Sequence, residues 1–463
     1  MASVTDRVED VRSRETSAWG IRPVPRALRT LSGLDLAVLW GDLSIGLLVL
    51  VTGALLVPAL GLPAAVAAIG IGTVIGCLPL GLVAAAGARE GVPAMVLFRP
   101  SLGLVGSYLP SVANLVQLAG WTAFEFWAIA RVANAAANDL FGVDAGLAWL
   151  VLTAVVCTGL ALAGPVFAVR RWLEKAGIWI LLGVGLFLTA RVAAVGDLGQ
   201  LWSQPGTGGL PFWLAVDLVI AMPVSWLPLV ADYTRFGRDT RAAAIGSATG
   251  YAIGNAWFYL LGVLLVLAAG AAADPLDIGT TIAAAGGGGV VLLALLAGET
   301  DQAMANVYSA AVTVQNVRPG WSQRGLIVGV GSVGFAVAAG IGADAAATLE
   351  GFLLLIGSVF VPLFGVFLAH WAVLARGRYG EAALFDEAHP GVRWGSAVAW
   401  ALGFVAFQWC APTTLVGWWA DGLEALFTGL GLPFPLIPGA ALGGSLPGFA
   451  VAFAAALGLA RGR

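Results

Sequence analysis

The feature that most constrains this chain is a succession of long apolar segments separated by short polar ones. An apolar run of about 20 residues crosses a bilayer as a helix, because only a helix satisfies its own backbone polar groups in lipid. We therefore expect an all-α membrane protein with about twelve transmembrane helices. The expected spans are residues 35–59, 63–88, 106–138, 146–168, 176–195, 211–234, 245–270, 286–315, 325–342, 347–373, 394–415 and 438–460.

Composition excludes a soluble protein. Hydrophobic residues make up 59% of the chain and charged residues 11%, whereas a soluble domain carries about 25% charged residues. The net charge of −3, with no long basic run, argues against a nucleic-acid partner. The first 30 residues are polar and rich in arginine, without the apolar core of a cleavable signal peptide. We expect residues 1–30 to form a flexible cytoplasmic tail.

Two residue types that often carry chemistry give no such signal here. Cys77, Cys157 and Cys410 are isolated within apolar runs, so they predict neither a disulfide framework nor a metal site. His370 and His389 lie at or beyond the end of an expected helix. We therefore expect no catalytic residues, no metal and no cofactor.

Charged loop residues predict the orientation in the membrane. If the N-terminus is cytoplasmic, arginine and lysine fall in the cytoplasmic segments and acidic residues in the opposite loops, as the positive-inside rule requires. The basic set is Arg89, Arg99, Arg170, Arg171, Lys175, Arg235, Arg238, Arg241, Arg318, Arg324, Arg376, Arg378, Arg393, Arg461 and Arg463, and the acidic set is Asp139, Asp144, Asp197, Asp274, Asp277, Asp344, Asp421 and Glu424. Both termini are therefore expected in the cytoplasm of a multi-pass cell-membrane protein.

Two expected spans contain residues that interrupt helices. The first span includes WGDLSIGLL (40–48), and the sixth includes MPVSWLPLV (222–230), where Ser225 and Trp226 lie between two prolines. Proline removes a backbone donor and clashes with the preceding turn. Paired interruptions in spans one and six indicate an inverted-repeat transporter with its site where the broken helices meet. The alternative is ordinary kinking, since glycine and proline are common in membrane helices.

Acidic residues inside the spans fall on the same set of helices. They are Asp42, Glu125, Asp217, Glu299 and Asp301, on spans one, three, six and eight. Each costs about 2.5–3.5 kcal/mol at a helix centre, so each needs a partner, a proton or water. These four helices line the site of a five-plus-five transporter. Asp217, near the outer end of its span, is the weakest candidate.

The third span presents one chemically distinctive face. Gln117, Trp121 and Glu125 are each four residues apart and share that face. A flat heteroaromatic ring could stack on the indole while its N–H groups donate to the carboxylate. The alternative is helix packing, with Glu125 neutral or paired to Arg131.

The eighth span carries an oxygen-rich patch that suits a cation. It comprises Glu299, Thr300, Asp301, Gln302 and Asn306. Hydroxyl and carboxylate oxygens suit Na⁺, and a buried carboxyl group suits a proton; main-chain carbonyls between Gly41 and Ile45 could complete the site. The alternative is that these polar side chains join helices to one another.

Three segments of the chain carry a resemblance to a known family: GSYLPSVANLVQLAGW (106–121), ADYTRFGRDTRAA (231–243) and IGNAWFYLLG (253–262). They resemble the purine–cytosine permease family, the first nucleobase:cation symporter family. The resemblance implies a leucine-transporter-like fold, a five-plus-five inverted repeat plus two C-terminal helices. We divide the chain accordingly into a tail (1–30), two five-helix repeats (31–195 and 196–378) and two additional helices (379–463).

The resemblance also implies the site. The family's stacking tryptophan falls on Trp121, and Pro223 replaces a sixth-helix aromatic. Either Trp226 supplies the second ring face from one turn away, or the substrate is held on one face only. Thr300-Asp301-Gln302 replaces a hydroxyl pair followed by asparagine, which leaves Na⁺ and H⁺ both open. The expected substrate residues are Gln117, Trp121, Glu125, Asp42, Ser225, Trp226 and Glu299, and the expected cation residues are Gly41, Ser44, Ile45, Thr300 and Asp301.

The functional hypothesis is a secondary transporter that imports a pyrimidine-like nucleobase, hydroxymethylpyrimidine or cytosine, with Na⁺ or H⁺. Spans one, two, six and seven would rock against spans three, four, eight and nine. A purine, allantoin or hydantoin is the alternative substrate. A channel is the alternative of another class, and a membrane enzyme or receptor is a further one. No ATPase signature of the GxxxxGK[ST] type occurs. Beyond the substrate and the bilayer, no obligate protein partner is evident.

Overall fold

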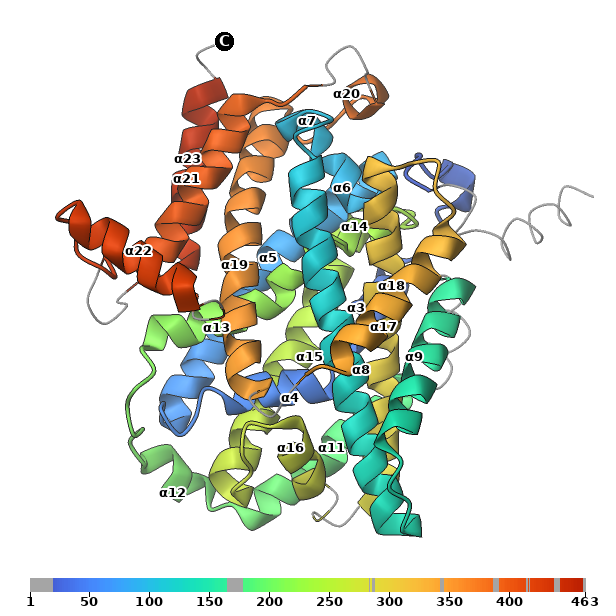
Figure 1. Cartoon of the computed structure of the whole chain (residues 1–463), viewed down its shortest axis with the longest axis vertical. Helices are drawn as coiled ribbons and strands as arrows, with labels where there is room; N and C mark the ends of the chain where they lie inside the picture. Colours follow the sequence, from blue (N-terminus) through green and yellow to red (C-terminus); the bar gives the residue numbers. More distant parts are fainter. Residues whose placement is uncertain are drawn as a thin grey trace, which may run out of the picture.

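The computed structural model describes residues 20–164, 178–282, 284, 288–341, 345–385, 391–413, 415, 417–436 and 442–460. The regular elements of this described part are helices, and one isolated bridge joins Leu31 to Gly237. Most of the long helices run along the long axis of the molecule and form one bundle (Figure 1).

The first half of the chain begins with a broken helix. Its two pieces, α3 (Gly33–Asp42) and α4 (Leu47–Ala54), meet at an angle of 60°. The long helices that follow are α5 (Leu62–Glu90), α8 (Tyr108–Phe141), α9 (Gly146–Ala163) and α11 (Ile178–Val195), with the short η1 (Arg26–Leu28), α6 (Ala94–Leu97), α7 (Arg99–Leu102) and α12 (Leu198–Ser203) between them.

The second half also begins with an interrupted helix. Here α13 (Phe212–Ser225) and α14 (Val230–Thr234) flank the interruption. Then follow α15 (Thr240–Ala269), α16 (Pro275–Ile282), α17 (Gly288–Val317), α18 (Gln323–Ala338), α19 (Ala345–Leu368), η4 (Ala369–Leu374), α20 (Glu381–Phe385), α21 (Trp394–Cys410), α22 (Gly417–Gly429) and α23 (Ser445–Ala460).

Several helices are long and apolar enough to span a bilayer. Within the described part, five meet this test, or six when the bent pair α3–α4 counts as one span. Shorter apolar helices cover 178–194, 323–338 and 445–459. The chain is therefore a multi-pass membrane protein. The segment expected as a loop after the eleventh span contains α22, which projects sideways from the bundle (Figure 1).

The long helices pack in two groups. Helices α3, α5, α13 and α15 pack on one another, and α8, α9, α17 and α18 form the second group. Glycine permits close approach within the first group: a Cβ atom on Gly250 of α15 would lie 2.2 Å from the carbonyl oxygen of Ala37 in α3. These two groups coincide with the two rocking units expected from the sequence.

The segment before α3 is attached to the bundle. The backbone N–H of Val24 donates to the Gly91 carbonyl (2.9 Å), and that of Leu31 donates to Phe236 (2.9 Å). The guanidinium of Arg29 donates to the Ala88 carbonyl (3.0 Å). Residues 20–30 therefore do not form the flexible tail expected there, because these backbone contacts hold them; residues 1–19 lie outside the described residues.

Asp217 has a structural partner. Its carboxylate accepts hydrogen bonds from the backbone N–H groups of Gly444 (2.5 Å) and Ser445 (3.1 Å), at the start of α23. A helix N-terminus favours a negative charge, because its first N–H groups have no partner inside the helix. Asp217 therefore caps α23, which agrees with its weak standing as a site residue.

Candidate functional site

The break in the first span is supported by α17. Gly46 precedes α4 in an extended conformation and offers no capping side chain. The Glu299 carboxylate accepts a hydrogen bond from the Leu47 N–H instead, and the Gln302 amide donates to the Ile45 carbonyl (3.1 Å). A distant helix thus supplies both the cap of α4 and the partner for a carbonyl at the break.

Glycine at position 46 leaves room for two polar side chains of α17. A Cβ atom there would lie 2.2 Å from both Glu299 Oε1 and Gln302 Nε2, so these side-chain ends would have to move away from their hydrogen-bond partners at the break. The absence of a side chain lets α17 approach the broken backbone directly.

The break in the sixth span is supported by α8 in the same way. The Gln117 amide nitrogen donates to the carbonyl of Ser225, the last residue of α13 (2.8 Å). The Asn114 amide donates to the Pro228 carbonyl (3.4 Å). Gln117 also donates to Asn114 Oδ1 (2.9 Å), so its nitrogen is occupied, whereas its Oε1 is buried and has no hydrogen-bond partner. The Ser225 hydroxyl donates locally to Met222 (2.6 Å).

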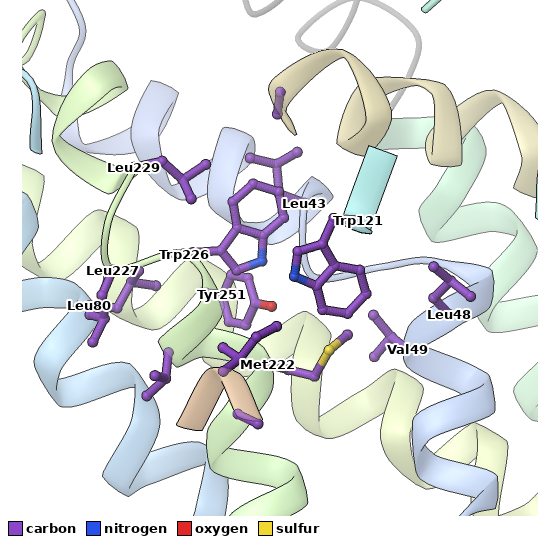
Figure 2. Packing of buried hydrophobic residues seen from close by; sticks show 14 of the residues in the cluster. Leu43, Leu48, Val49, Leu80, Trp121, Met222, Trp226, Leu227, Leu229 and Tyr251 are labelled. Carbon is purple, nitrogen blue, oxygen red and sulfur yellow. The ribbon is translucent and has the colours of Figure 1, made fainter. Parts of the chain in front are cut away.

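Aromatic side chains surround the centre between the two breaks. Trp121 meets Phe352 of α19 edge to face, with ring centroids 5.3 Å apart, and Trp226 meets Trp40 in the same way at 5.6 Å. Figure 2 shows the indole nitrogens of Trp121 and Trp226 turned toward each other, with the Tyr251 hydroxyl pointing into the same region.

Glu125 meets another acid. Its carboxyl group is in hydrogen-bonding contact with that of Glu299 on α17. The pairing of Glu125 with Arg131, considered from the sequence, is not what the structure has: the Arg131 guanidinium lies over the Trp127 ring, 4.9 Å from its centroid. Helix rotation explains the difference, because six residues along a helix turn the side chain to another face.

The expected cation residues come from two parts of the fold. Gly41 ends α3 with Asp42, and Ser44 and Ile45 lie in the first break; Thr300 and Asp301 lie on α17. Ser44 packs toward α15, where a Cβ atom on Gly254 would lie 2.0 Å from its hydroxyl oxygen. That hydroxyl donates to the Gly41 carbonyl (2.7 Å). The Ile45 carbonyl meets α17 through the Gln302 amide. Asp42 and Asp301 lie within electrostatic range of each other, and Thr300 is half-buried.

The substrate residues expected from the sequence are all enclosed. Their side chains are between 0% and 6% exposed, a set comprising Asp42, Gln117, Trp121, Glu125, Ser225, Trp226 and Glu299. Oxygen atoms on four of them have no hydrogen-bond partner: both of Asp42, Oε1 of Gln117, and Oε2 of Glu125 and Glu299. The Trp121 N–H is likewise unpaired. The enclosed centre therefore contains buried hydrogen-bond acceptors that no other group of the protein satisfies.

Sequence reasoning missed three residues of this centre. Tyr251 of α15 lies next to Trp226, Trp40 supports that tryptophan, and Phe352 supports Trp121. A tyrosine in an apolar span was a usable signal for Tyr251, although the same span also contains Tyr259. No such signal pointed to Phe352, because most residues of α19 are apolar and the orientation of that helix depends on packing.

A buried polar centre between two broken helices, inside a helical membrane bundle, defines a multi-pass transporter of the inverted-repeat type. The chain belongs to the family described as "Permease for cytosine/purines, uracil, thiamine, allantoin", whose sequence model matches residues 23–429. It is a permease and not an enzyme.

Curated relatives agree with this family. The chain is 26% identical over 327 residues to the cytosine permease of Escherichia coli (strain K12), covering 70% of this chain and 73% of the relative. It is 25% identical over 401 residues to a putative purine-cytosine permease of Bacillus subtilis (strain 168), covering 83% and 86%. An allantoin permease of the same organism is 23% identical over 375 residues, covering 74% and 75%.

Solved structures confirm the fold. Mhp1, a nucleobase-cation-symport-1 family transporter in a closed conformation with bromovinylhydantoin bound, superposes with a TM-score of 0.78 at 18% identity, covering 96% of this chain and 95% of that one. A Na⁺-coupled sialic acid symporter matches with a TM-score of 0.59 at 13% identity, covering 97% and 93%. The five-plus-five inverted repeat with additional C-terminal helices, expected from the sequence, is thereby confirmed as the fold class.

Proposed function

We propose that this permease imports a pyrimidine-like nucleobase, hydroxymethylpyrimidine or cytosine, together with Na⁺ or H⁺. The substrate ring stacks on the Trp121 indole, with Trp226 on its other side. Its N–H groups donate to the carboxyl groups below. Transport proceeds by rocking of the α3–α5–α13–α15 group against the α8–α9–α17–α18 group around this site.

The observation that carries the proposal is the set of unpaired acceptors beside Trp121. Gln117, Glu125 and Glu299 each keep one buried oxygen without a partner. Leaving such an atom unpaired costs about 1–3 kcal/mol. A bound ring whose amino group donates hydrogen bonds to these oxygens removes that cost. Both proposed substrates carry an amino group next to a ring nitrogen. Uracil has a carbonyl in place of the amino group of cytosine and fits less well.

Similarity to named relatives supports the same substrate class. The relatives include cytosine permeases of Escherichia coli. The second candidate is a purine, allantoin or hydantoin, which the similarity to an allantoin permease favours. These rings also present N–H donors, so a direct binding comparison must decide between them.

The proposed orientation has both termini in the cytoplasm. The ends of the bundle differ in charge: Arg99 begins α7 and Arg235 follows α14 at one end, whereas Asp197 precedes α12 and Asp277 lies in α16 at the other (Figure 1). By the positive-inside rule the first end faces the cytoplasm.

A binding panel on the purified protein tests the substrate. Cytosine, hydroxymethylpyrimidine, uracil, hypoxanthine, allantoin and hydantoin are compared by thermal shift and by competition against labelled cytosine. We expect an aminopyrimidine to bind about 100-fold more tightly than uracil, because the site would leave acceptors unpaired with uracil. Equal binding of uracil contradicts the donor–acceptor argument. Uptake into vesicles should saturate with concentration; flux without saturation would indicate a channel.

A further inference from the structure

Glu125 and Glu299 meet across the interface of α8 and α17 with their carboxyl groups in hydrogen-bonding contact. Their side chains are 1% and 0% exposed. Two ionised carboxylates have acceptors only, so neither can donate to the other. The contact therefore requires a proton on one of the two groups, and two charges placed together without it would repel each other away from water.

The surroundings determine which of the two groups keeps the negative charge. Glu299 accepts a hydrogen bond from the N–H of Leu47, the first residue of α4. The N-terminus of a helix stabilises an anion through its free N–H groups and its dipole. Glu125 has no such cap. The proton therefore resides on Glu125, which donates it to the Glu299 carboxylate.

The groups that face this pair supply no compensating charge. The titratable residues within electrostatic range of the pair or of its neighbours are Asp42 of α3, Cys157 of α9, Tyr251 of α15 and Asp301 of α17. Phe352 of α19 packs against Trp121 and Phe124, which both precede Glu125 along α8. The guanidinium of Arg131 is directed to Trp127.

These contacts join the two packing groups of the bundle. Glu125 and Glu299 belong to the α8–α9–α17–α18 group, and the Leu47 N–H belongs to the broken helix of the other group. One chain of hydrogen bonds thus runs from α8 through α17 to α4. It persists only while the pair holds a proton.

We propose that the Glu125–Glu299 pair is the proton-coupling site of this permease, and that one shared proton holds the two packing groups in the closed arrangement. Loss of the proton leaves two adjacent negative charges that are stabilised only by water, so it favours an opened arrangement. The inference rests on the proposed function, since it supplies the coupling ion for the same site. The Oε2 atoms of both residues stay free for substrate.

The first experiment needs no substrate. The melting temperature of the purified protein in nanodiscs is measured against pH in sodium-free buffer. The proton is bound in the closed fold, so its stabilisation is present at low pH and is lost as pH rises. We expect wild type to lose stability with rising pH and Glu125→Gln, which cannot release a proton, to be insensitive. Asp421→Asn, at an exposed acid of α22, is the control and should follow wild type.

The second experiment measures coupling in proteoliposomes with labelled cytosine. An inward-directed pH gradient should accelerate uptake by wild type without sodium, and apparent cytosine affinity should fall by up to about tenfold per pH unit for one linked proton. Glu125→Gln should lose both responses, whereas Asp421→Asn, at an exposed acid of α22, should keep them. In Glu299→Gln the amide oxygen can still accept a hydrogen bond from the Leu47 N–H, so the cap of α4 is kept and only the charge is lost. We expect this variant to lose the pH response as well.

The outcomes are distinguishable. A wild-type melting temperature that ignores pH, or Glu125→Gln uptake that still responds fully to a pH gradient, overturns the proton site. Uptake that follows a sodium gradient and ignores pH overturns it as well. If no compound of the panel binds, the proposed substrate class fails, whereas a pH-dependent melting temperature that Glu125→Gln abolishes still supports the proton site.

Discussion

The amide nitrogen of Gln117 lies 2.8 Å from the carbonyl oxygen of Ser225, at the point where the sixth span breaks. Glu299 contacts the first break in a corresponding way, through the Leu47 N–H. Gln117 lies on the third span and Glu299 on the eighth, which occupy equivalent places in the two expected repeats. Each broken helix is therefore stabilised by a helix from the other half of the chain.

Replacement of Trp121 by alanine tests the stacking platform. Removing the indole eliminates both the buried apolar area and the ring–ring contact with the substrate, together about 2 kcal/mol. We expect cytosine binding to weaken about 30-fold and uptake at low concentration to disappear, with normal membrane insertion. Trp179→Ala, at an exposed tryptophan of α11, is the control. Unchanged transport by Trp121→Ala would remove this residue from the site.

Replacement of Gly46 by alanine tests the close approach of α17 to the first break. The added Cβ atom would lie 2.2 Å from Glu299 Oε1 and Gln302 Nε2. We expect the variant to reach the membrane and lose transport by at least about tenfold, because Glu299 and Gln302 must leave their hydrogen-bond partners at the break, which costs about 1–3 kcal/mol. Gly70→Ala in α5 is the matched control, since no atom lies within 4 Å of its added Cβ. Normal uptake by Gly46→Ala would show that the contact is dispensable.

Replacement of Asp217 by alanine tests the assignment of this acid to structure. The variant loses the cap of α23, and caps of this type contribute about 0.5–2 kcal/mol. We expect a lower melting temperature in detergent and a cytosine affinity equal to that of wild type. Asp421→Asn, at an exposed position of α22, should leave both values unchanged. A large loss of affinity at normal stability would instead assign Asp217 to the site.

Asp301→Asn and Thr300→Val test the oxygen-rich patch of α17 as a contributor to cation coupling. Asp301 lies within electrostatic range of Asp42, so removing its charge changes the environment of any cation held there. We expect the ion-dependent part of cytosine uptake to fall at least about tenfold, measured as uptake with and without an imposed Na⁺ or pH gradient. If both variants keep the full ion dependence and Glu125→Gln loses it, coupling depends on the carboxyl pair alone.

Much of the fold followed from the sequence. Runs of about 20 apolar residues specify membrane helices, and the glycine and proline interruptions marked the two broken spans that the structure has at 43–46 and 226–229. The acids on spans one, three and eight, together with Trp121 and Trp226, identified the buried centre. The short helices α12, α16 and α22 were missed, because a segment of 5 to 15 residues outside the membrane carries a weak periodic signal.

The sequence by itself determined the class of protein, because the energetics of an apolar segment in lipid depend on local composition and length. Only the tertiary structure decided which groups these residues contact. Glu125 meets Glu299 and not Arg131, and Asp217 caps the start of α23. Ser44 packs against α15, and Trp121 packs against Phe352. Such contacts join residues far apart in the chain and depend on the rotation and depth of each helix. Spacing along one helix fixes which side chains share a face, but not what that face meets.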